Sequence, residues 1–263
     1  MKQLRWGLIK EQMTVQLQVR TLNFYSFFLL ILQPAVFSIV GMLLSRAAGN
    51  ALPDLVYSVI GGGIMGMWSG IVFTSTYDIA ADRVNGVLEL IVGSPTSLAD
   101  VEAIRTLTNV LAGLGSLLLA FLAAITIFDY DLSDINFWGI AISLLLLLFA
   151  MWCTGVFLAN FLAWSRISST FVEYLEMPIA ILCGFMYPLR VLPDWMRGIS
   201  TLLPIRWALE AMNESLLGKQ DWGYLVEHWA IAVVQCLLLM GINYLLQKKV
   251  QEHIRVSGEL SSL

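Results

Sequence analysis

Six long apolar runs limit the folds open to this chain more than any other feature. They lie at about residues 22–45, 55–77, 104–128, 137–160, 168–189 and 226–247. Crossing the hydrocarbon core of a bilayer takes roughly 20 apolar residues in a helix that rises about 1.5 Å per residue. Hydrophobic residues make up 58% of the sequence and charged residues 13%, with a mean hydropathy of +0.77, which excludes an ordinary soluble domain. We therefore predict an all-α integral membrane protein with six transmembrane helices, because a transmembrane barrel would show alternating strands of about ten residues.

The lysines and arginines predict how these helices are oriented. If the N-terminus is cytoplasmic, the inner set is Lys2, Arg5, Lys10, Arg20, Arg83, Arg105, Arg166, Lys248, Lys249 and Arg255. The outer set is then Arg46, Arg190, Arg197, Arg206 and Lys219. The excess of basic residues on the cytoplasmic side favours this orientation, with both termini inside. Residues 190–225 then face the exterior, although they contain four of the five outer basic residues.

The two ends of the chain are expected to lie at the cytoplasmic surface. Residues 1–21 have apolar side chains on one side of a helix: Trp6, Ile9, Met13 and Leu17. This spacing predicts a helix lying in the membrane interface, although residues 13–19 also alternate with the period of a strand. Residues 248–263 form a cytoplasmic tail. The whole chain, 1–263, is one membrane domain, with spans 1 and 2 in 22–77 and spans 3 to 5 in 102–189.

A charged segment, 78–101, separates the second and third apolar runs. Its apolar residues recur at helical spacing: Val84, Val87, Leu88 and Ile91. The opposite face is polar: Asp82, Arg83, Asn85, Gly86 and Glu89. This pattern predicts a short amphipathic helix over 82–92, which Pro95 terminates because proline lacks an amide donor. Ser97 and Asp100 then fit a capping box that starts the next helix, although an ordinary interfacial connector explains the segment equally well.

The outer segment, 190–225, is too long for a turn and too polar to cross the membrane. Prolines divide it and the residues just before it into two short helical patterns: Pro188, Pro193 and Pro204. The second pattern has one apolar side, made of Ile205, Leu209, Met212 and Leu216, and Gly218 is a natural stop. Both helices could enter the outer leaflet and return, or they could form a surface loop folded on the bundle.

Glycines recur at every fourth position in the second run. Gly62, Gly66 and Gly70 leave one helix face without side chains, so another helix backbone can approach closely. The contact could lie within one subunit or between two, and we favour packing within the subunit.

Two carboxylates stand near the cytoplasmic start of the fifth run. Glu173 and Glu176 share one helix face, and a charge placed in lipid costs about 2.5 kcal/mol or more, so such groups usually face a cavity or a partner. They are candidate pathway residues for a cationic or polar substrate. The alternative is that the span begins late and both glutamates lie among the lipid headgroups.

No catalytic or metal-binding pattern is present in the sequence. Its two histidines, His228 and His253, are expected at opposite ends of the last span, and no cysteine and histidine spacing suggests zinc. The three cysteines, Cys153, Cys183 and Cys236, lie in apolar runs and are expected to be buried. No basic stripe suggests binding to nucleic acid.

Two blocks of sequence resemble the permease subunits of type-2 ABC transporters, the ABC-2 membrane family of drug, Nod-factor and polysaccharide exporters. The first is "DRVNGVLELIVGSPTSLADV" and the second is "CGFMYPLRVLPDWMRGISTLLPIRWALEAMNESLLG". The resemblance implies that 82–97 is a coupling helix seated on a separate ATPase subunit. It also implies that 190–218, with Gly184 and Pro188 just before it, forms paired re-entrant helices ahead of the last span. The expected assembly has two copies of the permease and two ATPases, which would hold ATP and Mg. The chain itself is not expected to be an enzyme or to hold a cofactor, and it contains no Gly-x-x-x-x-Gly-Lys-Ser/Thr pattern with which to cradle ATP.

The predicted function is the membrane half of an ATP-driven exporter in the bacterial cytoplasmic membrane. A hydrophobic or amphipathic substrate, such as a drug, antibiotic or lipid, is favoured. The alternatives are an exporter of a lipid-linked polysaccharide and, from other classes, an ion-coupled secondary transporter, a membrane-embedded enzyme or a membrane scaffold.

Overall fold

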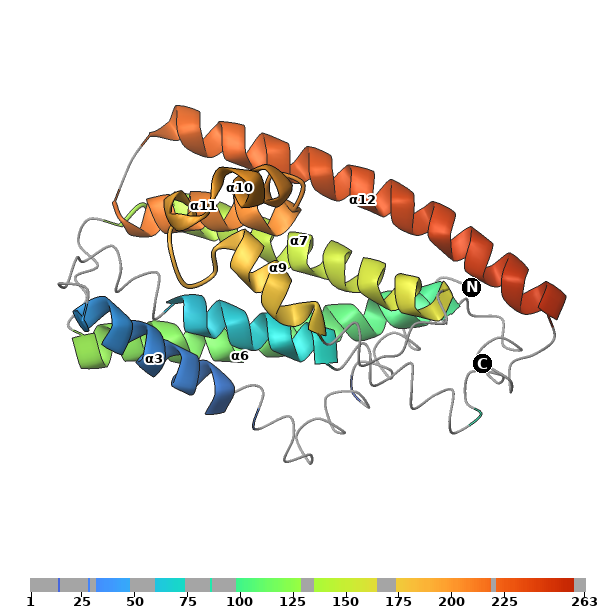
Figure 1. Cartoon of the computed structure of the whole chain (residues 1–263), viewed down its shortest axis with the longest axis horizontal. Coiled ribbons are helices and arrows are strands. Elements are labelled where there is room, and N and C mark those ends of the chain that lie inside the picture. Colours follow the sequence, from blue (N-terminus) through green and yellow to red (C-terminus); the bar gives the residue numbers. More distant parts are fainter. Residues whose placement is uncertain are drawn as a thin grey trace.

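The structure is a computed structural model, and all of its described regular structure is helical (Figure 1). It describes residues 32–47, 60–73, 98–128, 135–164, 174–218 and 221–257, together with Thr14, Phe28 and Gly86. The labelled helices are α3 (Gln33–Ala47), α6 (Leu98–Phe128), α7 (Phe137–Trp164), α9 (Glu176–Cys183), α10 (Asp194–Ser200), α11 (Pro204–Leu216) and α12 (Trp222–Ser257). A 3₁₀ turn, η2 (Leu189–Val191), precedes α10, and an unlabelled helix, Ile60–Phe73, lies between α3 and α6 in the chain.

Three of the described helices are long and apolar enough to cross a membrane. They are Asp100–Leu122 in α6, Phe137–Phe161 in α7 and Trp222–Lys249 in α12. They correspond to the third, fourth and sixth apolar runs of the sequence. The helix Ile60–Phe73 is apolar but shorter within the described residues. Most of the predicted interfacial helix, the first parts of the first and fifth spans, both ends of the second span and the end of the tail lie outside the described residues. The six-span topology therefore stays a prediction.

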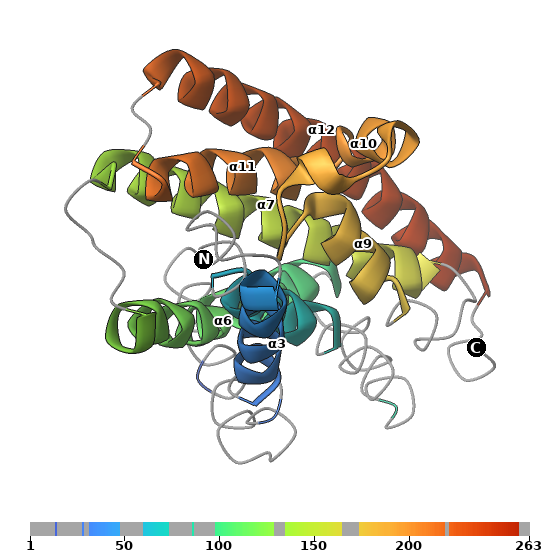
Figure 2. The ribbon, with the colours of Figure 1, turned by 60° about the vertical axis from the view of Figure 1, so that its left-hand side comes forward.

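The helices pack as a bundle with the Ile60–Phe73 helix inside it. Helices α7, α11 and α12 pack on one another, α6 packs on α7, and α3 packs on α6. In both ribbon views α12 and α3 lie on opposite sides of the bundle (Figure 1, Figure 2). Every residue of 60–72 is buried, which places this helix among its neighbours rather than at the lipid surface.

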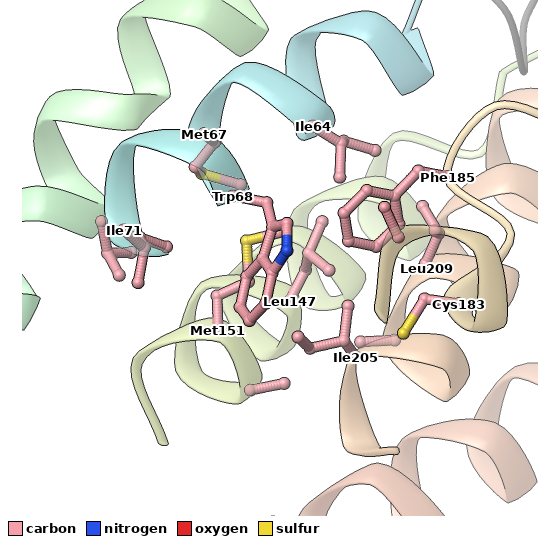
Figure 3. Close-up of a cluster of buried hydrophobic side chains, with 14 of the residues drawn as sticks. Ile64, Met67, Trp68, Ile71, Leu147, Met151, Cys183, Phe185, Ile205 and Leu209 are labelled. Carbon is pink, nitrogen blue, oxygen red and sulfur yellow. The ribbon is translucent and has the colours of Figure 1, made fainter. Parts of the chain in front are cut away.

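The hydrophobic core centres on Trp68 (Figure 3). Its indole is fully buried and meets the ring of Phe185 edge-on, with the ring centroids 6.4 Å apart. Leu147 and Met151 of α7 and Ile205 of α11 join the same cluster. The polar end of the indole is also satisfied, because Nε1 donates to the backbone oxygen of Glu176 at 3.2 Å.

Side-chain hydrogen bonds fix the contacts of α7 with its neighbours. Trp152 Nε1 donates to the backbone oxygen of Ala103 in α6 at 2.9 Å. Trp229 Nε1 of α12 donates to Ser143 Oγ at 2.8 Å, and Asn243 Nδ2 donates to the backbone oxygen of Cys153 at 3.2 Å. Polar groups buried among apolar helices need such partners, and each bond therefore selects one register between two helices.

The fifth apolar run does not continue as a helix to about residue 189, so this part of the prediction is wrong. Helix α9 ends at Cys183, and Gly184 follows in the left-handed conformation with φ 66° and ψ 45°. The amides of Gly184 and Phe185 donate to the backbone oxygens of Ile181 and Ala180 at 3.1 and 3.2 Å, closing the end of the helix. The chain then turns, which returns Phe185 to the core.

Candidate functional site

Of the predicted coupling helix, residues 82–97, the structure describes one residue, Gly86. This residue lies in an exposed turn with φ 68°, whereas a residue inside an α-helix has φ near −63°. The prediction of one continuous helix over 82–92 is therefore wrong at Gly86, where the missing Cβ allows a left-handed turn. The other five residues predicted to contact an ATPase lie outside the described residues: Asp82, Arg83, Asn85, Glu89 and Pro95.

Each of the four positions predicted in the re-entrant segment lies at the boundary of an element. Gly184 caps α9, Pro188 precedes η2, Pro193 precedes α10, and Pro204 is the first residue of α11. Proline suits these places because its fixed φ fits the start of a helix, where its missing amide would have no partner inside the helix. The two short helices thus begin where the prolines predict.

Helix α11 presents its apolar side to the bundle. Ile205, Leu209, Met212 and Leu216 are all at most 2% exposed, as their spacing predicts. The helix ends at Leu216, and Gly218 follows with φ 73°. Asn213 of the same helix is also buried. The second short helix is therefore part of the core rather than a loose surface loop.

The turn between α9 and η2 is held by a side chain. The Tyr187 hydroxyl donates to the backbone oxygen of Ile181 at 2.7 Å. A tyrosine hydroxyl has a proton to donate, and this bond ties the turn back to the last part of α9.

Two glycines of the predicted packing face lie against α3. A Cβ added at Gly66 would lie 2.0 Å from Pro34 Cγ, and one added at Gly62 would lie 2.0 Å from Ser38 Oγ. These contacts are within one subunit. Gly70 is buried as well. Another glycine of this helix, Gly61, lets the backbone of Phe185 approach closely.

Glu176 lies inside the bundle, and Glu173 lies outside the described residues. The Glu176 residue is 6% exposed, and its Oε1 accepts hydrogen bonds from Ser69 Oγ and, at 3.3 Å, from Gln33 Nε2. The same Gln33 amide donates to Ser69 Oγ at 2.9 Å. One carboxylate therefore joins α3, the Ile60–Phe73 helix and α9, three segments that are far apart in the sequence.

A buried polar stripe on α6 was not predicted. Its members are Glu102, Thr106, Asn109 and Ser116, each at most 1% exposed. Glu102 pairs with Arg105, with Oε1 and Nη1 3.0 Å apart. The four positions recur at spacings of three, four and seven residues, which is the signal of one helix face. Helical spacing, which predicts the glycine face, therefore also predicts this polar face from the sequence.

No cluster of three or more histidine, cysteine or acidic residues that could hold a metal ion occurs in the described part of the chain. All three cysteines are free and buried, as their apolar surroundings predict.

Comparison with known families adds one match. The sequence model of the family described as ABC-2 type transporter matches residues 6–217. No curated protein gives a significant match.

Proposed function

Because this chain belongs to the ABC-2 type transporter family, we propose that it is the membrane subunit of an ATP-driven exporter in the bacterial cytoplasmic membrane. The family match covers most of the chain, and it is the observation that carries this conclusion. The chain is an ABC transporter permease and a multi-pass membrane protein. The direction of transport, the membrane and the cytoplasmic position of both termini are parts of the proposal. The distribution of lysine and arginine supports that orientation.

Energy for transport is proposed to come from a separate ABC ATPase, the usual partner of this family. The chain lacks the glycine-rich lysine motif that cradles nucleotide phosphates, so ATP and Mg would be held by the partner. The proposed assembly has two ATPases and two copies of the permease.

The segment around Gly86 is proposed to receive the movement of the ATPase. Asp82, Arg83, Asn85 and Glu89 would provide its polar contacts, and Pro95 would set the angle at which α6 begins. An ATPase can shift the permease between two states only if its contacts differ between those states. The turn at Gly86 supports this role, because it is exposed and a Cβ there would meet nothing within 4 Å.

The substrate is proposed to be hydrophobic or amphipathic, with a positive charge that Glu176 recognises. The support is the place of this carboxylate, buried where three segments of the bundle meet. Glu173, which is close to Glu176 in the sequence, would share this role.

Transport in inverted membrane vesicles tests the proposal. Vesicles containing the chain and its partner ATPase are expected to accumulate a fluorescent lipophilic cation when ATP is added. A partner whose nucleotide-binding lysine is replaced by alanine is the control and should abolish uptake. Uptake that follows an ion gradient and ignores ATP would instead indicate a secondary transporter.

A further inference from the structure

Two side chains of the polar stripe on α6, Thr106 and Asn109, make no hydrogen bond with the described part of the chain. Both residues are 0% exposed. The unbonded atoms are the Thr106 hydroxyl and both ends of the Asn109 amide. Other buried amides of the described chain have at least one bonded end, as Asn243 does through its contact with the backbone oxygen of Cys153. Asn109 therefore lacks more hydrogen bonds than any other described amide in the interior.

The Thr106 hydroxyl also differs from the other threonine hydroxyls buried in these helices. A threonine inside a helix commonly donates to the backbone oxygen one turn earlier. Thr108 does so to Ile104 at 2.9 Å, and Thr154 does so to Ala150 at 2.8 Å. Thr106 makes no such bond, so its hydroxyl needs a partner from outside its own helix.

Thr106 and Asn109 lie on the face of α6 that packs against the Ile60–Phe73 helix. Residues three apart on a helix are neighbours, with about 5–6 Å between their Cβ atoms. Gly113 continues this face one turn beyond Asn109, and a Cβ added there would lie 2.5 Å from Cγ of Met67. Met67 belongs to the buried cluster of Figure 3. The two polar side chains are thus directed into the interior of the bundle.

Helix α7 borders the same place through Gly155. A Cβ added at Gly155 would lie 2.6 Å from Cγ2 of Ile71 and 2.7 Å from Cγ2 of Thr106. The methyl group of Thr106 therefore fits between α7 and the Ile60–Phe73 helix. Three helices meet here, within the part of α6 that is long and apolar enough to cross a membrane.

The chemistry of this place fits a small neutral molecule that both donates and accepts hydrogen bonds. The Asn109 amide presents a donor and an acceptor, and the Thr106 hydroxyl can act as either. Burying such groups without hydrogen bonds is unfavourable, and the apolar parts of Met67 and Ile71 supply none. Lipid chains supply none either. A buried water molecule typically makes about three hydrogen bonds to polar groups of this kind.

We propose that Thr106 and Asn109 form a water-binding site between α6, α7 and the Ile60–Phe73 helix. Bound water accepts from Asn109 Nδ2 and donates to Asn109 Oδ1, and it is the partner of the Thr106 hydroxyl. The contact of α6 with its two neighbours is therefore hydrated at this depth, although the side chains around it are apolar. The site is a property of the permease alone and does not depend on the proposed substrate.

Hydroxyl-radical labelling tests the site in the full-length chain, purified in detergent. An X-ray pulse produces these radicals from water, including water bound inside a protein, and they oxidise the side chains beside it. Met67 is the reporter, because it is 0% exposed and lies one turn from Asn109 across the helix contact. Met212 is the reference, because it is 2% exposed on the apolar side of α11. We expect Met67 to be oxidised at least about threefold faster than Met212, since methionine oxidation follows access of the oxidant.

Three variants connect the labelling to the two polar side chains. Asn109→Leu should lower the oxidation rate of Met67 to that of Met212. Thr106→Val, which keeps the branched shape and removes the hydroxyl, should also lower it. Thr108→Val is the matched control and should leave it unchanged, because that hydroxyl is bonded within its own helix.

Two results would overturn the proposal. The first is a wild-type rate for Met67 no higher than that for Met212. The second is a rate for Met67 that stays high in both Asn109→Leu and Thr106→Val, or that Thr108→Val lowers as much as they do.

Discussion

Gly66 lies where two helices approach each other closely. A Cβ there would lie 2.0 Å from Pro34 Cγ of α3, so Gly66→Ala must push the helices apart. We expect it to destabilise the fold by about 1–3 kcal/mol, measured as a lower melting temperature in detergent. Gly115→Ala on α6 is the control, because a Cβ there meets nothing within 4 Å, and alanine in a helix is favourable by about 0.5–1 kcal/mol. Equal losses in the two variants would contradict the packing argument.

Glu176→Gln separates the charge of this residue from its shape. The glutamine carbonyl can still accept from Ser69, so the contacts among the three helices should persist and the melting temperature should change little. Export of a lipophilic cation is expected to fall about tenfold, a difference of about 1.4 kcal/mol, while export of a neutral substrate of similar size should not change. Ser69→Ala is the control that removes a hydrogen bond and keeps the charge. Equal export of both substrates by Glu176→Gln would remove Glu176 from the pathway.

Single residues also differ in how far the sequence could predict them. The glycine face follows from spacing alone, because Gly62 and Gly66 share one side of any helix that contains them. The partners of Glu176 could not be predicted in this way, since Ser69 and Gln33 are 107 and 143 residues away in the chain. A buried carboxylate needs hydrogen-bond partners, but the packing of three helices decides which residues these are.

At the scale of the element, the end of α9 depends on one left-handed residue. Gly184→Ala should cost about 1–2 kcal/mol, because a residue with a Cβ is strained at φ 66° and its Cβ would also lie 2.7 Å from Leu189 Cδ2. The expected result is a lower melting temperature. Gly198→Ala in α10 has open space around its Cβ and should leave the melting temperature near that of the wild type. A tolerated alanine at 184 would show that the turn after α9 does not need the left-handed conformation.

Helix boundaries were predictable where the sequence marks them chemically. The prolines and Gly218 delimit α10 and α11, and the fourth apolar run begins at the same residue as α7, Phe137. The end of α9 was missed because Phe185 continues the apolar run after Gly184, so hydropathy shows no break there. Gly86 was missed for a related reason, since a pattern of apolar residues cannot show that the backbone turns between them.

At the scale of the whole molecule, the packing of the bundle follows from contacts between distant segments. The number of apolar runs predicts a helical membrane protein, but nothing in their spacing predicts that α7, α11 and α12 pack together. That arrangement depends on specific partners, such as the indole of Trp229 and the hydroxyl of Ser143, which only the folded chain brings together. The family match supplies the functional class, which periodicity alone does not determine.

The whole assembly is tested by exchanging charges in the proposed coupling segment. Arg83→Glu combined with Glu89→Arg keeps the net charge but reverses the pattern that a partner ATPase would meet, and misplaced charges weaken recognition across an interface. We expect normal insertion into the membrane and continued ATP hydrolysis, with export in inverted vesicles reduced by at least about tenfold, that is by about 1.4 kcal/mol in coupling. Asp194→Arg is the control, because its side chain is 93% exposed on α10, which the predicted orientation places on the other side of the membrane. Normal export by the doubly exchanged variant would mean that the ATPase does not act on the permease through Arg83 and Glu89.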